Sequence, residues 1–308
     1  MKSTRKAYGE ALVKIGKEDK DVVVLDADLS NATQTMLFKS EFPERHINVG
    51  IAEQDLVGTA CGLALSEKKV YLSSFAVFLA GRAYEQIRNT AAYSNIPIKL
   101  CATHSGLSVG EDGATHQMLE DISLMRSVPN MVVLSPADEN STKQIIKDIK
   151  EYTEGPVYVR LGRCDVPDIY GENETFEIGK SKTFSNGTKA TIFATGYTLH
   201  IAIEAMQMLK EQGVDVRVVD LYSIKPIDKD TIIKCAKETE KLITVEDHSI
   251  IGGIGTAICE VLAEEYPKKV TRLGVNDKFG KSGSVKELMN MYGITKEHII
   301  EEVLKKEE

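Results

Sequence analysis

Short runs rich in β-branched and other apolar residues recur along this chain, and helical patterns separate them. The runs lie at 21–29, 47–49, 70–75, 98–102, 131–135 and 156–161, and then at 191–195, 216–220 and 242–246. Continuous apolar runs of this length are typical of parallel strands that are buried on both faces. Strands that alternate with helices at this pitch, such as the helix predicted over 117–126, favour a parallel sheet covered by helices. We therefore predict an α/β fold with two parallel-sheet domains.

The alternation is interrupted once, near the middle of the chain. Residues 163–175 lose their periodicity and gather Pro, Gly and acidic residues, which is typical of a linker. We predict one domain over residues 1–168, a linker over 169–185 and a second domain over 186–308. A chain of 308 residues is long enough to bury two cores.

Composition excludes several classes of function. The formal net charge of -8, without a basic block, argues against nucleic acid as a partner. Five scattered cysteines without CxxC spacing indicate reduced thiols rather than disulfides or a zinc site. No signal peptide is visible, and no apolar run reaches the roughly 18 residues that span a bilayer. We therefore expect a cytoplasmic protein without a membrane partner.

Polar residues follow the first predicted strand. Asp26, Asp28, Ser30 and Asn31 come at or just after its end. In open α/β sheets, residues beyond the carboxyl ends of strands commonly line ligand sites. Residues of these types also cap helices, and the pattern alone does not separate the two interpretations.

The stretch from 70 to 117 holds the most chemistry. Phe75 and Phe78 lie three residues apart, ahead of a helix with Arg82, and a glycine-rich loop then carries His104 and His116. Aromatic residues beside histidines predict a pocket for a flat ring with acid/base groups at its rim. The alternative is a core aromatic pair next to a solvated turn.

Two glycine- and alanine-rich helices allow competing interpretations. The helix over 51–65 is rich in small residues, which predicts close packing at an interface, and Glu53 lies in its first turn. By spacing alone, Glu53 is an ordinary first-turn acid. The glycines at 252–255 could bind a phosphate at a helix N-terminus. They match no phosphate-binding motif, so close helix–strand packing explains them better.

Taken together, these stretches resemble the C-terminal half of transketolase, meaning its pyrimidine-binding and C-terminal domains. The resemblance covers essentially the whole chain. It is carried, in the family's order, by S-T-R-K-A (3–7), L-D-A-D-L-S (25–30), V-G-I-A-E-Q (49–54), S-F-A-V-F-L-A-G-R-A-Y (74–84), V-G-E-D-G-A-T-H-Q (109–117) and V-E-D-H with G-G-I-G (245–255).

The resemblance implies thiamine diphosphate as the cofactor. Glu53 matches the catalytic glutamate that hydrogen-bonds the pyrimidine and so helps to remove the thiazolium C2 proton. A dry site strengthens such a bond. Phe75 and Phe78 match the aromatics that enclose the pyrimidine, and Arg82 is grouped with them as a cofactor-binding residue. Asp28 and Leu29 match residues near the cofactor at a subunit interface.

The resemblance also implies a site for a sugar phosphate. His116 matches a catalytic histidine that contacts the donor's carbonyl end and helps to move protons. His104, Arg163 and Arg5 match residues that bind the sugar phosphate, and Ser30 or Asn31 is a further candidate. Asp112 matches an acid that contacts substrate hydroxyls. Arginine suits phosphate because its planar fork binds two oxygens. Arg160 competes with Arg163 in the alignment, and we predict Arg163.

The chain departs from the family in two ways. It lacks the G-D-G stretch and downstream Asn that hold Mg²⁺ and the diphosphate in full transketolases. We therefore expect a separate N-terminal transketolase subunit that carries this site, in a homodimer or heterotetramer, and no metal ligand in this chain. Gly81 also stands where full-length transketolases have an aromatic, which leaves the third wall of the pyrimidine pocket undefined.

These observations lead to one expected function and two alternatives. We expect the C-terminal subunit of a split transketolase of the pentose phosphate pathway, which transfers a two-carbon ketol unit from a ketose phosphate to an aldose. The segment around Gly81 looks more like deoxyxylulose-phosphate synthase or the β subunit of a 2-oxo-acid dehydrogenase. A non-catalytic homologue that only binds an N-terminal chain is the other alternative.

Overall fold

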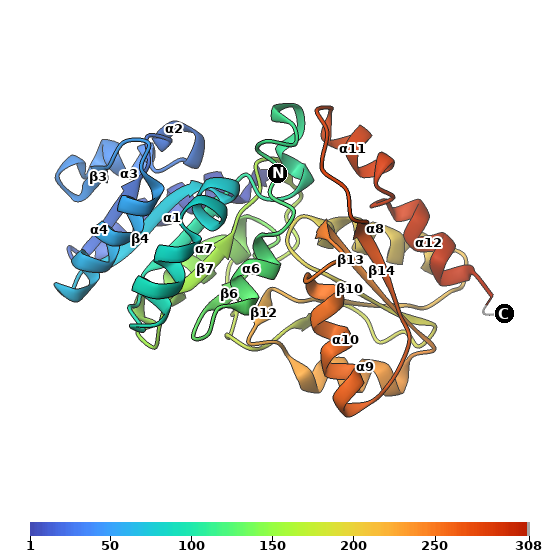
Figure 1. Cartoon of the computed structure of the whole chain (residues 1–308). Coiled ribbons are helices and arrows are strands. Elements are labelled where there is room, and N and C mark those ends of the chain that lie inside the picture. The colour runs from blue at the N-terminus through green and yellow to red at the C-terminus, as the bar shows by residue number, and fades with distance from the viewer. Residues whose placement is uncertain (307–308) are drawn as a thin grey trace.

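A seven-stranded sheet organises the first half of the chain. The structure is a computed structural model that describes residues 1–306, and the strand order is β12-β6-β7-β5-β4-β2-β3 (Figure 1). All neighbouring strands run parallel except β12, which pairs antiparallel with β6. The strands are β2 (Val22–Asp26), β3 (His46–Asn48), β4 (Lys69–Phe75), β5 (Lys99–Thr103), β6 (Val132–Leu134), β7 (Val157–Arg160) and β12 (Ser223–Lys225).

Helices cover both faces of this sheet, which explains why its strands are largely apolar. Val22 and Val24 of β2 share a core with α1 (Thr4–Glu18) and α7 (Glu139–Asp148). Val23 and Leu25 of the same strand share a second core with α4 (Glu53–Leu65). Successive side chains of a strand point to opposite faces, so a strand between two helical layers has no face left for polar residues.

A five-stranded sheet organises the second half, in the order β14-β13-β10-β11-β9. Only β9, at one edge, is antiparallel to its neighbour. The strands are β9 (Lys182–Thr183), β10 (Ala190–Ala194), β11 (Arg217–Asp220), β13 (Lys241–Ser249) and β14 (Val270–Val275), and the helices are α8 (Thr198–Glu211), α9 (Lys229–Glu238), α10 (Ile254–Glu265), α11 (Val285–Met291) and α12 (Lys296–Leu304). The predicted class, two parallel-sheet α/β domains, is confirmed.

Several short elements join these layers. They are β1 (Lys2–Ser3), which pairs with β8 (Asp165–Val166), the helices α2 (Ser30–Thr33), α3 (Met36–Glu41), α5 (Tyr84–Gln86) and α6 (Asp121–Ser127), the 3-10 turns η1 (Pro43–Arg45), η4 (Leu107–Asp112) and η5 (Ile149–Glu151), and the π-helical segments η2 (Val77–Arg82) and η3 (Ile87–Ala92). Within residues 1–306, no helix is both long enough and apolar enough to cross a membrane.

Several element boundaries differ from the prediction, and two of the differences have a clear physical reason. The first strand ends at Asp26 rather than at 29, because Asp28 has a left-handed φ of 59° that extended strands do not tolerate. The helix expected over 117–126 begins only at Asp121. The carbonyls of Met118 and Leu119 instead accept hydrogen bonds from Gly106 and Ser249, so tertiary contacts replace the first helical turn.

Candidate functional site

The carboxyl ends of the parallel strands bring distant parts of the sequence to one edge of the sheet. Asp26 at the end of β2 is in register with Asn48 of β3 and with Ser73 of β4. Phe75 at the end of β4 is in register with Thr103 of β5, which directly precedes His104. This edge is the usual place for a ligand in an open α/β sheet.

Glu53 is a buried carboxylate at the start of α4. Its side chain is only 1% exposed, and its Oε2 lies 2.7 Å from the guanidinium Nη1 of Arg82. Arg82 is 48% exposed, and its guanidinium lies 4.6 Å from the ring centre of Phe78. Arg82 therefore connects the carboxylate to the aromatic side chains, and it does so from the solvent side.

Two phenylalanines and two histidines form one aromatic cluster beside this carboxylate. Phe75 and Phe78 stack with ring centres 5.8 Å apart and planes inclined by 12°. His104 stacks on Phe75 at 3.7 Å, and His116 meets Phe75 and Phe78 edge-on at 6.1 and 5.6 Å. The structure thus brings together the predicted strand-end aromatics and both predicted loop histidines.

His104 is held as a neutral imidazole. Its left-handed φ of 56° turns the ring inward after β5, where Thr103 Oγ1 lies 2.9 Å from its Nδ1. Burial lowers its pKa to about 3, and the nearby charges of Arg5, Arg163 and His116 act in the same direction. At neutral pH, His104 can therefore exchange hydrogen bonds with a ligand without carrying a charge.

Positive charge gathers next to His104. Burial lowers the pKa of Arg5, and the neighbouring Arg163 lowers it further, whereas Asp112 is among the acids that oppose this. Arg5 donates to the carbonyl of Ala32 at 2.8 Å, and Arg163 contacts Val109 O and Glu111. An anion bound between two arginines relieves their mutual repulsion, so the region between Arg5 and Arg163 suits a phosphate group.

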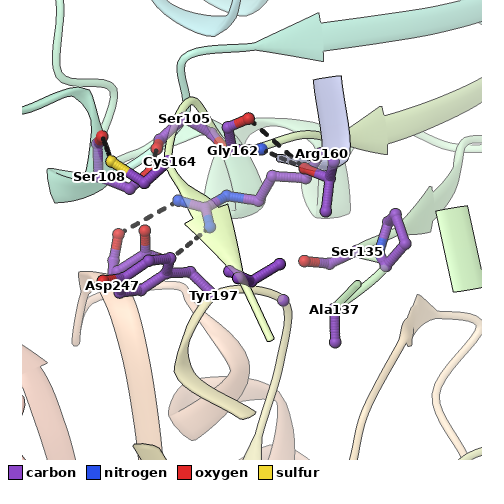
Figure 2. Close-up of a pocket in the computed structure, with 13 residues that line it drawn as sticks. Ser105, Ser108, Ser135, Ala137, Arg160, Gly162, Cys164, Tyr197 and Asp247 are labelled. Carbon is purple, nitrogen blue, oxygen red and sulfur yellow. Dashed lines mark hydrogen bonds and ion pairs between the residues drawn. The ribbon is translucent and has the colours of Figure 1, made fainter. Parts of the chain in front are cut away.

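Arg160 has a different role from Arg163. Only 3% of its side chain is exposed, its Nε lies 2.9 Å from Asp121, and its Nη1 lies 2.7 Å from Asp247 of the second domain. Figure 2 shows Arg160 reaching from β7 to Asp247 beside a pocket that Ser135 and Tyr197 help to line. The donors of Arg160 are thus used within the buried protein, whereas the side chain of Arg163 is 31% exposed.

The predicted residues after β2 lie at the same edge but have partners of their own. Asp28 exchanges hydrogen bonds with Asn48, at 3.1 Å through its backbone N–H and 3.0 Å through its carboxylate. Leu29 is the N-cap of α2, and Ser30, the first residue of that helix, is buried. The contacts found for this group run along β2 and β3, rather than to the aromatic cluster.

Sequence reasoning missed the partner of Asp26. His46 Nε2 lies 2.8 Å from Asp26 Oδ2, which Thr35 also contacts at 2.9 Å. Both partners are distant in sequence from Asp26, and only the pairing of β2 with β3 brings Asp26 and His46 together.

The glycine turn at 252–255 is explained by packing, as the sequence favoured. The carboxylate of Glu246 accepts the backbone N–H groups of Ile254 and Gly255 at 2.8 and 3.0 Å, and a Cβ on Gly253 would collide with it. Glu246 thus occupies the backbone N–H groups at the N-terminus of α10 that a phosphate could otherwise bind. Burial raises the pKa of Glu246 to about 7. Over the described residues 1–306, no three His, Cys, Asp or Glu side chains are grouped so as to hold a metal ion.

Comparisons with known proteins agree on one family. The family model described as transketolase, pyrimidine binding domain, matches residues 1–168, and that described as transketolase, C-terminal domain, matches residues 179–299. A Methanocaldococcus jannaschii protein named as a transketolase C-terminal section is 51% identical over 98% of this chain and 96% of its own length.

Two further relatives have the same extent as this chain. One of the subunits of the apulose-4-phosphate transketolase of Phocaeicola vulgatus is 40% identical over 99% of this chain and 97% of its own length. A solved structure titled split gene transketolase, inactive beta4 tetramer, superposes with a TM-score of 0.91 at 46% identity, covering 98% of this chain and 97% of the other. By contrast, this chain spans 48% of the length of rat transketolase.

Proposed function

Because this chain belongs to the transketolase family and contains its pyrimidine-binding and C-terminal domains, we propose that it is the C-terminal subunit of a split transketolase. Assembled with an N-terminal subunit, it transfers a two-carbon ketol unit from a ketose phosphate to an aldose or aldose phosphate. The observation that carries this proposal is the buried Glu53 beside the Phe75–Phe78 pair, with the two histidines and two arginines next to it.

The residues present fit the pyrimidine end of thiamine diphosphate, the cofactor on which the family depends. Glu53 offers a carboxylate shielded from water, as a hydrogen bond to a pyrimidine ring nitrogen requires. Phe78 offers an aromatic face that Arg82 now covers, and Arg82 is exposed enough to turn toward solvent. When bound, the cofactor supplies a nucleophilic thiazolium carbon.

The remaining predicted residues suit a phosphorylated sugar. We assign Arg5 and Arg163 to the phosphate, with His104 as a neutral hydrogen-bonding partner and Ser30 beyond them. His116 lies at the rim of the aromatic cluster, where it can move a proton at the substrate's carbonyl end. Asp112, on the exposed side of the same loop, is assigned to substrate hydroxyls.

The diphosphate and Mg²⁺ are assigned to the N-terminal subunit, because this sequence has no G-D-G stretch with a downstream Asn. The helix α4 supports a contact with such a subunit. Its glycines Gly58 and Gly62 face open space, and Ile51 and Leu65 at its two ends are 77% and 73% exposed. Small residues flanked by exposed apolar side chains suit a close interface. Asp28 and Leu29, at the same sheet edge, are assigned to this cofactor interface.

A reconstituted enzyme tests the proposal. The chain is mixed with a candidate N-terminal subunit, thiamine diphosphate and Mg²⁺, and ketose-to-aldose transfer is measured. Glu53→Ala is expected to lower kcat by about 100-fold or more, within the range for general acid–base groups. Glu297→Ala is the matched control, because Glu297 is an exposed acid in the first turn of α12, away from α4 and the aromatic cluster. An assembled wild-type pair without transfer activity would overturn the proposal.

A second enzymatic function is favoured by one position. Gly81 lies next to Arg82, and a side chain at this position would point into open space. Full-length transketolases have an aromatic residue at the matching position. Deoxyxylulose-phosphate synthesis or 2-oxo-acid decarboxylation are the alternatives of this kind. Release of CO₂ from pyruvate by the reconstituted pair, faster than ketol transfer, would favour them.

A further inference from the structure

The substrate loop, defined as residues 104–117, contacts the second domain at several points. At the top of Figure 1 this loop lies beside the chain segment that leads into α11, although more than 150 residues separate them. We propose that the C-terminal domain sets the working shape of the substrate loop, and that Gln117 and Asp247 are the positioning residues that do so. The catalytic part of this inference rests on the proposed function.

Three glycines of the loop mark the contacts. Gly106, Gly110 and Gly113 have left-handed φ values of 69°, 76° and 79°. A Cβ on Gly106 would lie 2.5 Å from the backbone oxygen of Asp247, and one on Gly113 would collide with Ser282. Gly110 faces Val285 at 3.4 Å. All three positions favour glycine for their backbone conformation, and Gly106 and Gly113 also require it for the close approach of the other domain.

Gln117 fastens the end of the loop that carries His116. Its side chain is buried, and its Nε2 donates to Gly110 O at 3.1 Å and to Lys281 O at 2.9 Å. One amide group therefore holds the middle of the loop and a segment of the C-terminal domain together. Gly280 makes this possible, because any side chain there would collide with Gln117.

Asp247 fastens the end that carries His104. It is 1% exposed, it accepts from Arg160 at 2.7 Å, and its backbone presses on Gly106, two residues after His104. The next residues of β13 continue the contact, since Ser249 N–H donates to Leu119 O at 2.8 Å. Both ends of the loop are thus attached to the C-terminal domain rather than only to their own sheet.

This attachment matters because the loop carries His104, Asp112 and His116, which are predicted to bind substrate. A loop rich in glycine loses much conformational entropy when it is ordered, and the contacts above provide that order from outside. A misplacement of about 1 Å in a catalytic group can lower the rate by about 100-fold. The C-terminal domain therefore affects catalysis through the shape of the loop.

The variant Gln117→Met tests the inference, because methionine keeps the volume and removes the amide. Two measurements are made: backbone hydrogen exchange of residues 104–117 in the chain alone, and kcat together with cofactor affinity in the reconstituted pair. Exchange in the loop should rise about tenfold or more relative to wild type, while exchange in β2 and β4 should not change. In the pair, kcat should fall about 10- to 100-fold at unchanged cofactor affinity.

The matched control is Gln207→Met, on an exposed turn of α8, which should change neither measurement. Unchanged exchange in the loop of Gln117→Met overturns the inference, as does an equal rise in the control. If Gln117→Met does not fold, Gln117→Asn replaces it with the same expectations, since it keeps the amide but is one methylene too short. The exchange measurement does not depend on ketol transfer, so failure of the proposed function would be seen separately.

Discussion

Replacing Arg160 by methionine should destabilise the protein by about 3–5 kcal/mol at neutral pH. Methionine fills a similar volume but leaves two buried carboxylates, Asp121 and Asp247, without their cation. These acids are 0% and 1% exposed, so water cannot replace the guanidinium. Removing one partner of a buried ion pair typically costs about 3–5 kcal/mol for that reason.

The loss of stability caused by Arg160→Met should depend on pH. Burial raises the pKa of Asp247, and Arg160 is the main influence that opposes the rise. Without Arg160 the pKa rises further, and an acid whose pKa is raised by folding destabilises the fold where it is ionised. The loss should therefore be larger at pH 8 than at pH 5, because lowering the pH favours the protonated, uncharged form of Asp247.

The assay is urea denaturation followed by circular dichroism at both pH values, at a fixed protomer concentration because assembly contributes to stability. Arg217→Met is the matched control: Arg217 is similarly buried, but its partner Glu238 is 43% exposed and can be solvated. We expect the control to lose about 1 kcal/mol at both pH values. A loss below about 1 kcal/mol for Arg160→Met, or one independent of pH, would refute the reasoning.

Three other substitutions probe the linker, the glycine turn and the phosphate site. Asp138→Ala should lower the free energy of unfolding by about 2–4 kcal/mol in urea denaturation. The buried carboxylate of Asp138 accepts four hydrogen bonds, two from Ser141 and one each from the backbone N–H groups of Ile169 and Tyr170 in the linker. Ser284→Ala, at an exposed helix cap, should lower it by about 1 kcal/mol, and equal losses in the two variants would contradict the argument. As the pH falls from about 8 to 5, the melting temperature of the wild type should rise relative to that of Glu246→Gln, because folding raises the pKa of Glu246 to about 7. A difference between the two proteins that does not change with pH would count against the role of Glu246. In the reconstituted pair, Arg163→Met should raise KM for the ketose phosphate about tenfold or more with a smaller change in kcat; a change confined to kcat would remove Arg163 from the phosphate site.

Much of the fold was predictable because it depends on local patterns. The run at 98–102 became β5 (Lys99–Thr103) and that at 191–195 became β10 (Ala190–Ala194), each shifted by one residue. The helices were predicted less well where side chains and carbonyls are used in tertiary contacts. The stretch after Phe75 winds as π-helical turns, which keep Phe78 and Arg82 on one side, and residues 118–119 bind other parts of the chain instead of starting α6.

The candidate site was predictable in its residue types and not in its contacts. Motif order pointed to Glu53, Phe75, His104 and His116, and these four meet at one sheet edge. That Arg82 covers Glu53, and that Arg160 is buried between domains, follows from no local pattern. Ion pairs of this kind join side chains that are 29 and 87 positions apart, so only the folded chain shows which arginine remains available for a ligand.

The sequence by itself determined the class of the fold, the order of its strands along the chain and the resemblance to one enzyme family, because apolar periodicity and short motifs are local properties. Only the tertiary structure decided which charges are paired, that Glu246 fills the glycine turn of α10, and that the C-terminal domain holds the substrate loop. Those features depend on groups that are distant in sequence and close in space. Their energies come from burial, which strengthens each paired charge and penalises each unpaired one, and burial exists only once both domains have packed.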